Sequence, residues 1–178
     1  MIVVGILAPG GAGERALEIA RRAAASGARI EVVGVVAATP AGDAMLLDLA
    51  AAATGHATVI RSAAEGIEPA DLDLALRYLP DVRAVVLVDP EAPLLSVARG
   101  AASWSGASLV VVAATGEVTD EGPGPAPIVL EPPATDPDGT FAGFVAALAV
   151  RLDAGEEPAV AWRSTIDALA VDPVSGSA

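Results

Sequence analysis

The chain has 178 residues and a formal net charge of −13, so it fits one domain and is a poor partner for nucleic acid or an anionic membrane. It has no cysteine and one histidine, which excludes disulfides, thiolate catalysis and a metal site built from several histidines. All ten basic residues are arginine, which excludes chemistry that needs a lysine. Because only 3% of residues are aromatic although 53% are hydrophobic, the core must be built from Ala, Val, Leu and Ile.

The N-terminal segment predicts a buried strand rather than a signal peptide. It lacks a basic region before its apolar run and leads into a glycine-rich loop. The apolar stretch from Phe141 to Val150 is too short to span a bilayer and is followed by Arg151. We therefore expect a cytoplasmic protein with no membrane contact.

Short apolar runs alternate with helical patterns along the whole chain, as is typical of a mostly parallel sheet covered by helices on both faces. The predicted strands are Ile2–Ala8, Arg29–Val36, Ala57–Arg61, Ala84–Asp89, Ser108–Ala113 and Pro127–Leu130. The predicted helices are Glu14–Ala25, Pro40–Ala53, Asp71–Leu79, Pro93–Trp104, Thr140–Asp153 and Glu157–Ala170. The pattern predicts one three-layer α/β/α domain over residues 1–170 and a flexible tail over 171–178.

Two segments of the chain carry recognisable motifs. The first, Pro9 to Ala16, is rich in glycine and leads through an Ala-rich helix to a Val-rich strand. The second, Asp136 to Phe144, reads Asp-Pro-Asp-Gly-Thr-Phe-Ala-Gly-Phe. Together with the strand–helix order between them, they resemble the glycine-rich stretch and the Asp-Thr-Xaa-Gly-Ala-Gly-Asp-Xaa-Phe-Xaa-Gly motif of the PfkB (ribokinase-like) family of carbohydrate kinases. The resemblance implies a ribokinase-like core that lacks the lid of the larger family members.

The resemblance also implies site residues and, for an active enzyme, ATP and Mg²⁺. The implied substrate-binding residues are Gly10, Gly11, Gly13 and Glu14. The implied nucleotide-binding residues are Asp136, Asp138, Gly139 and Thr140.

The catalytic turn departs from the family pattern. Aligned without a gap, Gly139 stands at the position of the catalytic base, and Asp136 and Asp138 replace the two glycines of the anion hole. Carboxylates cap a helix N-terminus well but repel phosphate there. A shift of one residue would make Asp138 a base without restoring the glycines.

We therefore expect a protein without phosphotransfer activity, cofactor or metal site that binds a small metabolite or a protein partner; an active sugar or nucleoside kinase is the alternative. An aspartate of the turn should cap a helix running from about Thr140 to Asp153. Because a core without its lid leaves apolar surface exposed, we also expect a homodimer formed through an edge strand or the two C-terminal helices.

The same glycines allow two further interpretations. Gly11, Gly13 and Ala16 fit the dinucleotide fingerprint Gly-Xaa-Gly-Xaa-Xaa-Gly/Ala, and Glu31 is expected near the end of the next strand, where such proteins bind a ribose. A Rossmann-like dinucleotide-binding protein is therefore a second alternative. The glycines also suit a tight strand-to-helix turn with no ligand at all.

Overall fold

The computed structural model describes residues 1–7, 11–52, 54–62, 66–79, 81–114, 116 and 124–171. Within these residues, six strands form one sheet in the order β3-β2-β1-β4-β5-β6, and every neighbouring pair is parallel. The strands are β1 (Ile2–Leu7), β2 (Glu31–Ala37), β3 (Gly55–Ser62), β4 (Ala84–Val88), β5 (Ser108–Val112) and β6 (Ile128–Leu130).

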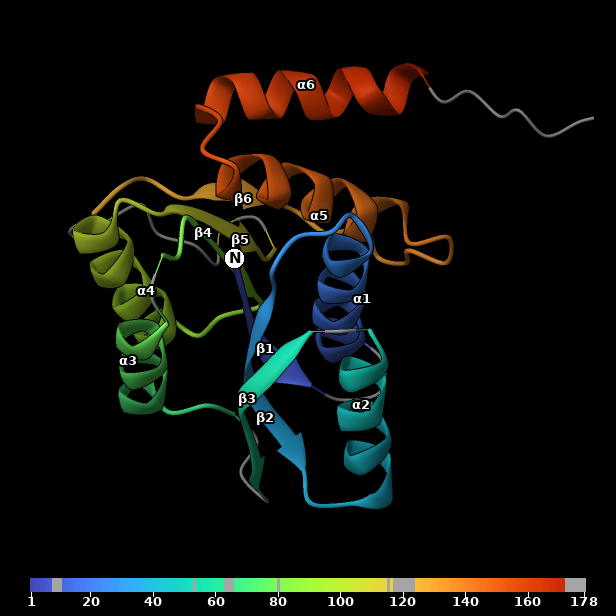
Figure 1. The fold of residues 1–178 in the computed structure, drawn as a ribbon, viewed down its shortest axis with the longest axis vertical. Coiled ribbons are helices and arrows are strands. Elements are labelled where there is room, and N and C mark those ends of the chain that lie inside the picture. The colour runs from blue at the N-terminus through green and yellow to red at the C-terminus, as the bar shows by residue number, and fades with distance from the viewer. Residues whose placement is uncertain are drawn as a thin grey trace, which may run out of the picture.

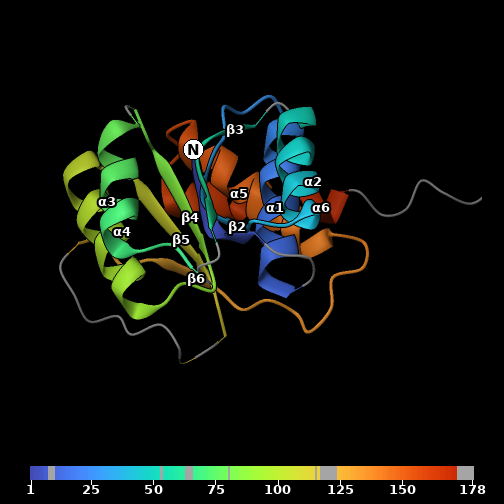
Figure 2. The ribbon, with the colours of Figure 1, turned by 90° about the horizontal axis from the view of Figure 1, so that it is seen from below.

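Helices cover both faces of this sheet (Figures 1 and 2). On one face lie α1 (Gly11–Ala25), α2 (Pro40–Ala51) and α5 (Thr140–Asp153). On the other lie α3 (Pro69–Tyr78) and α4 (Ala92–Ser105). The last helix, α6 (Pro158–Val171), packs on α5 and lies away from the sheet (Figure 1). The predicted three-layer α/β/α sandwich is confirmed.

The central strands are continuous apolar runs because both of their faces are covered. All five residues of β4 are buried, and alternate residues contribute to opposite cores. Val86 packs with the α1, α2 and α5 side, whereas Val85 and Leu87 pack with the α3 and α4 side. All twelve predicted elements are present in the described residues, with ends that differ by up to three residues. Residues 172–178 of the predicted tail lie outside the described residues.

No helix in the described ranges combines the length and the apolar character needed to cross a bilayer.

Small side chains bring α1 close to the sheet. Ala16 and Ala20 of α1 are fully buried, and a Cβ added at Gly5 of β1 would lie only 3.0 Å from the Cβ of Ala16. Neither Gly5 nor Ala16 has room for a longer side chain unless the helix moves. These small residues therefore allow a short distance between α1 and β1.

Replacing Gly5 with Val should lower the free energy of unfolding by about 1–3 kcal/mol, because the added carbons overpack the contact with Ala16. Gly100 is a matched control, since it lies inside α4 and a Cβ there meets nothing within 4 Å. Gly100→Ala should raise stability by about 0.5–1 kcal/mol through helix propensity. Urea denaturation measures both changes, and an unchanged midpoint for Gly5→Val would contradict the proposed close packing.

Candidate functional site

The sheet has a point at which successive strand-to-helix connections leave for opposite faces. The helix after β1 packs on one face and the helix after β4 on the other, although β1 and β4 are neighbours. In open α/β sheets, ligands bind outside the carboxyl ends of the strands at such a switch point. Here Asp89 follows β4 with a φ of 45°, and its carboxylate lies 3.5 Å from Arg15 of α1. Gly10, which follows β1, lies outside the described residues.

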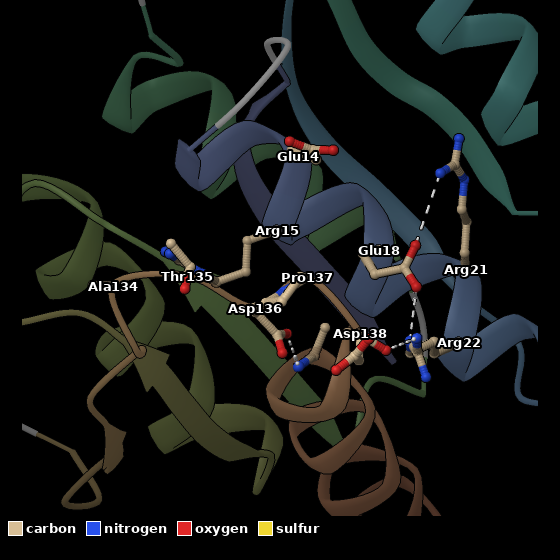
Figure 3. A pocket seen from close by; sticks show the side chains of 12 residues that line it. Glu14, Arg15, Glu18, Arg21, Arg22, Ala134, Thr135, Asp136, Pro137 and Asp138 are labelled. Carbon is tan, nitrogen blue, oxygen red and sulfur yellow. Dashed lines mark hydrogen bonds and ion pairs between the residues drawn. The ribbon is translucent and has the colours of Figure 1, made fainter.

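A cleft of about 520 Å³ lies between α1 and the segment 134–139 that leads into α5 (Figure 3). One wall is the polar face of α1 and the other is the Asp136–Gly139 turn. Glu14 and Arg15 of the first segment that resembles the kinase family therefore lie across the cleft from Asp136–Gly139 of the second, although more than a hundred residues separate them in the chain. The charged lining residues are Glu14, Arg15, Glu18, Arg21, Arg22, Asp136 and Asp138.

Asp136 occupies the N-terminus of α5 with its own carboxylate. Its Oδ1 accepts a hydrogen bond from the backbone N–H of Phe141 at 3.1 Å, and its Oδ2 accepts one from Ala142 at 2.9 Å. The first turn of a helix presents such N–H groups without partners, and the helix dipole favours an anion there. The predicted helix is confirmed. Its N-cap residue is Gly139, and an aspartate of the turn caps the helix from three residues earlier, so the anion at this position belongs to the chain itself.

Arg22 of α1 holds the turn from the other side. Its Nη2 donates to the carbonyl oxygen of Asp138 at 3.0 Å, and its Nε donates to Glu18 at 2.7 Å. Gly139 has a φ of 66°, which favours glycine, and a Cβ there would collide with the guanidinium of Arg22. The left-handed backbone of Gly139, more than the movable guanidinium of Arg22, favours glycine at the position that the family motif gives to the catalytic base.

The remaining charges of the cleft are mostly paired with neighbours. Arg21 contacts Asp48 at 2.8 Å, and Arg15 contacts Asp89. Among the described residues, no hydrogen bond or ion pair reaches the carboxylates of Glu14 and Asp138. Glu14 and Asp138 are therefore the lining carboxylates that have no partner among the described residues, whereas each lining arginine contacts a carboxylate. In the same part of the chain, no group of three acidic or histidine side chains is close enough to hold a metal ion.

The sequence-predicted site residues are only partly brought together. Glu14, Asp136, Asp138 and Gly139 line the cleft, whereas Thr140 does not. Gly11 opens α1 and Gly13 lies in its first turn.

Sequence reasoning missed the three arginines of the cleft. Arg15, Arg21 and Arg22 line the cleft from α1, but no sequence signal told which segment this face of the helix would meet. Only the tertiary structure shows that this face of α1 contacts the Asp136–Gly139 turn.

The expected ribose-binding position of Glu31 is wrong. Glu31 is the first residue of β2 and pairs with Ile2, so it lies at the amino edge of the sheet. The seven residues of β2 separate it from the carboxyl edge by about 20 Å. The carboxyl end of β2 is Ala37, which offers no acid to a ribose.

Comparisons with known proteins identify the fold and no family. No protein-family model matches the chain, and no curated protein is similar to it. A solved structure named Sa239 is similar over 99% of this chain and 91% of its own, with a TM-score of 0.65 and 15% sequence identity. At this identity the similarity shows a shared α/β architecture alone.

Replacing Asp136 with Ala should lower the free energy of unfolding by about 1–2 kcal/mol, since two N–H groups of α5 lose their acceptor. Asp138→Ala is the matched control, because that exposed carboxylate has no partner in the described residues and its loss should change stability by less than about 0.5 kcal/mol. Chemical denaturation distinguishes the two variants. Equal stabilities would mean that the cap contributes nothing.

Proposed function

We propose that this chain is a binding protein without phosphotransfer activity, and that its cleft takes a small polyhydroxylated molecule that carries no phosphate. One observation supports the first part above all others: the carboxylate of Asp136 accepts the N–H groups of Phe141 and Ala142. A helix N-terminus is where a ribokinase-like enzyme would hold transferring phosphate. Here that position is filled by a group of the same charge sign as the ligand it would need to admit.

Electrostatics makes replacement of this carboxylate by phosphate unfavourable. At about 4 Å, two like charges repel by roughly 1–4 kcal/mol in a partly solvated site. Asp138 adds a second carboxylate to the same turn. Phosphoryl transfer also needs a group that orients the attacking hydroxyl, and Gly139 supplies none. The residues present therefore do not fit the ATP and Mg²⁺ that the family resemblance implies.

The cleft suits a different ligand. Its volume of about 520 Å³ falls in the range of small-molecule sites. The carboxylates of Glu14 and Asp138 have no partner among the described residues, so they offer strong acceptors to hydroxyl donors. The arginines are held by Glu18, Asp48 and Asp89 and are less available to an anion. A sugar-like molecule with several hydroxyls fits this set of groups.

A dinucleotide-binding protein is the second candidate, because two observations favour it. The strand order 3-2-1-4-5-6 is that of two joined mononucleotide-binding halves. Ala16 also packs against Gly5, as the third position of the fingerprint does when a helix lies close to its strand. Two features argue against a dinucleotide. The exposed carboxylate of Glu14 in the first turn of α1 would repel a pyrophosphate, and β2 ends without an acid that could bind the ribose.

Ligand binding is tested by thermal unfolding with ribose, fructose, ribose 5-phosphate, ATP and NAD at millimolar concentrations. At one hundred times its dissociation constant, a ligand stabilises the native state by about 2.7 kcal/mol. We expect stabilisation by an unphosphorylated sugar alone, and its loss in a variant carrying Glu14→Gln and Asp138→Asn. Glu68→Gln, an exposed change on α3's N-terminal side, is the control that should keep it. Stabilisation by NAD would favour the second candidate instead.

Catalytic silence is tested separately. With ATP and Mg²⁺, the protein should form no phosphorylated product from ribose, fructose or adenosine above the background without protein. Turnover that disappears in Asp138→Ala would contradict the proposal and assign Asp138 the role of a base.

A further inference from the structure

The last helix leaves several large apolar side chains partly exposed. The buried residues of α6, which packs on α5, are small: Ala161 is 0% exposed and Thr165 is 1% exposed. Trp162, Ile166 and Leu169 remain 37%, 44% and 47% exposed. Only Trp162 has an aromatic neighbour, Phe144 of α5, at a ring-centroid distance of 5.3 Å. We call Trp162, Ile166 and Leu169 the α6 stripe.

The α6 stripe is continuous along the helix. At about 100° per residue, Trp162 and Leu169 lie on one flank of Ile166, within about 60° of it. Arg163 and Asp167 lie on the opposite flank. Spacings of four and three residues are those of a helix that packs on another helix. The exposed arc therefore has an apolar centre and one charged border that carries both signs.

This arc is complementary to a second copy of itself in antiparallel orientation. When a two-fold axis relates two antiparallel helices that lie side by side, each flank lies next to the same flank of the other helix. Residues at equal distances on either side of the axis then face each other. The midpoint of Trp162 and Leu169, the midpoint of Arg163 and Asp167, and Ile166 itself all fall between residues 165 and 166.

One axis position thus satisfies three pairings at once. Trp162 faces Leu169 of the second copy, Ile166 faces its own equivalent, and Arg163 faces Asp167 of the second copy. Among the described residues no ion pair reaches Asp167, and Arg163 donates only to the backbone oxygen of Ala159, at 3.2 Å. Both groups are therefore available for an intermolecular pair.

We propose that the α6 stripe is the interface of a homodimer in which two α6 helices pack antiparallel about a two-fold axis near residues 165–166. Two-fold dimers are the commonest closed assemblies of soluble proteins. The charge pairing distinguishes this occupant from an unrelated apolar surface, because a partner without the same Arg163 and Asp167 arrangement would leave the charged border unmatched.

Sedimentation equilibrium at micromolar concentration tests the assembly. The wild-type chain should sediment at twice the mass of one chain, and Ile166→Glu should sediment as a monomer because it places two carboxylates at the axis. Leu74→Glu is the control, since Leu74 is 54% exposed on α3, which covers the other face of the sheet, and should leave the dimer intact. A wild-type monomer, or a dimer that survives Ile166→Glu, would overturn the proposal.

The charged border has its own test. Arg163→Asp and Asp167→Arg should each raise the dissociation constant of the dimer roughly tenfold, because each creates two like-charge contacts across the axis. The double exchange should restore the wild-type value. Equal dissociation constants for the wild-type chain and both single variants would show that Arg163 and Asp167 do not face each other.

Because the chain has no cysteine, a single one introduced at the axis reports on the geometry directly. Ile166→Cys should form a disulfide-linked dimer on mild oxidation, since residues facing their own equivalents across packed helices come within disulfide reach. Leu74→Cys should stay unlinked under the same conditions. Efficient linkage of Leu74→Cys without linkage of Ile166→Cys would place the interface elsewhere.

Discussion

Two hydrogen bonds to the carboxylate of Asp136 hold the start of α5, and this helix contacts α1, the sheet and α6. Asp136 accepts the first N–H groups of α5 and so fixes where the helix begins. From there, α5 packs on α1 and on the sheet and carries α6 on its outer surface. In the proposed function, the same carboxylate keeps external anions away from the helix N-terminus. The side chain of Asp136 thus both caps α5 and carries the main argument for the proposed function.

Two arginine contacts extend this constraint to the cleft. Arg22 binds the backbone of the Asp136–Gly139 turn, in which a φ of 66° favours glycine at position 139, and Arg15 contacts Asp89 after β4. Both arginines project from α1, whose distance from the sheet is set by the contact between Gly5 and Ala16.

The cleft and the α6 stripe use different elements. The cleft is formed by α1 and the turn before α5, whereas the stripe lies on the exposed part of α6. The proposed ligand binding and the proposed self-association can therefore be tested by separate substitutions. The charged cleft and the mixed apolar and charged stripe also select by different forces, since hydrogen bonds orient a small polar molecule and apolar burial drives helix association.

The sequence by itself determined the elements and the layers. Apolar runs such as Ala84–Val88 and the glycine and proline boundaries identify strands and helices, because these signals are local. The aspartate cap of α5 was equally predictable, since capping acts over a few residues. Only the tertiary structure decided that Arg22 of α1 meets the Asp136 turn and that α5 covers the small residues of α6. Those facts depend on contacts between distant segments, for which local residue patterns carry no signal.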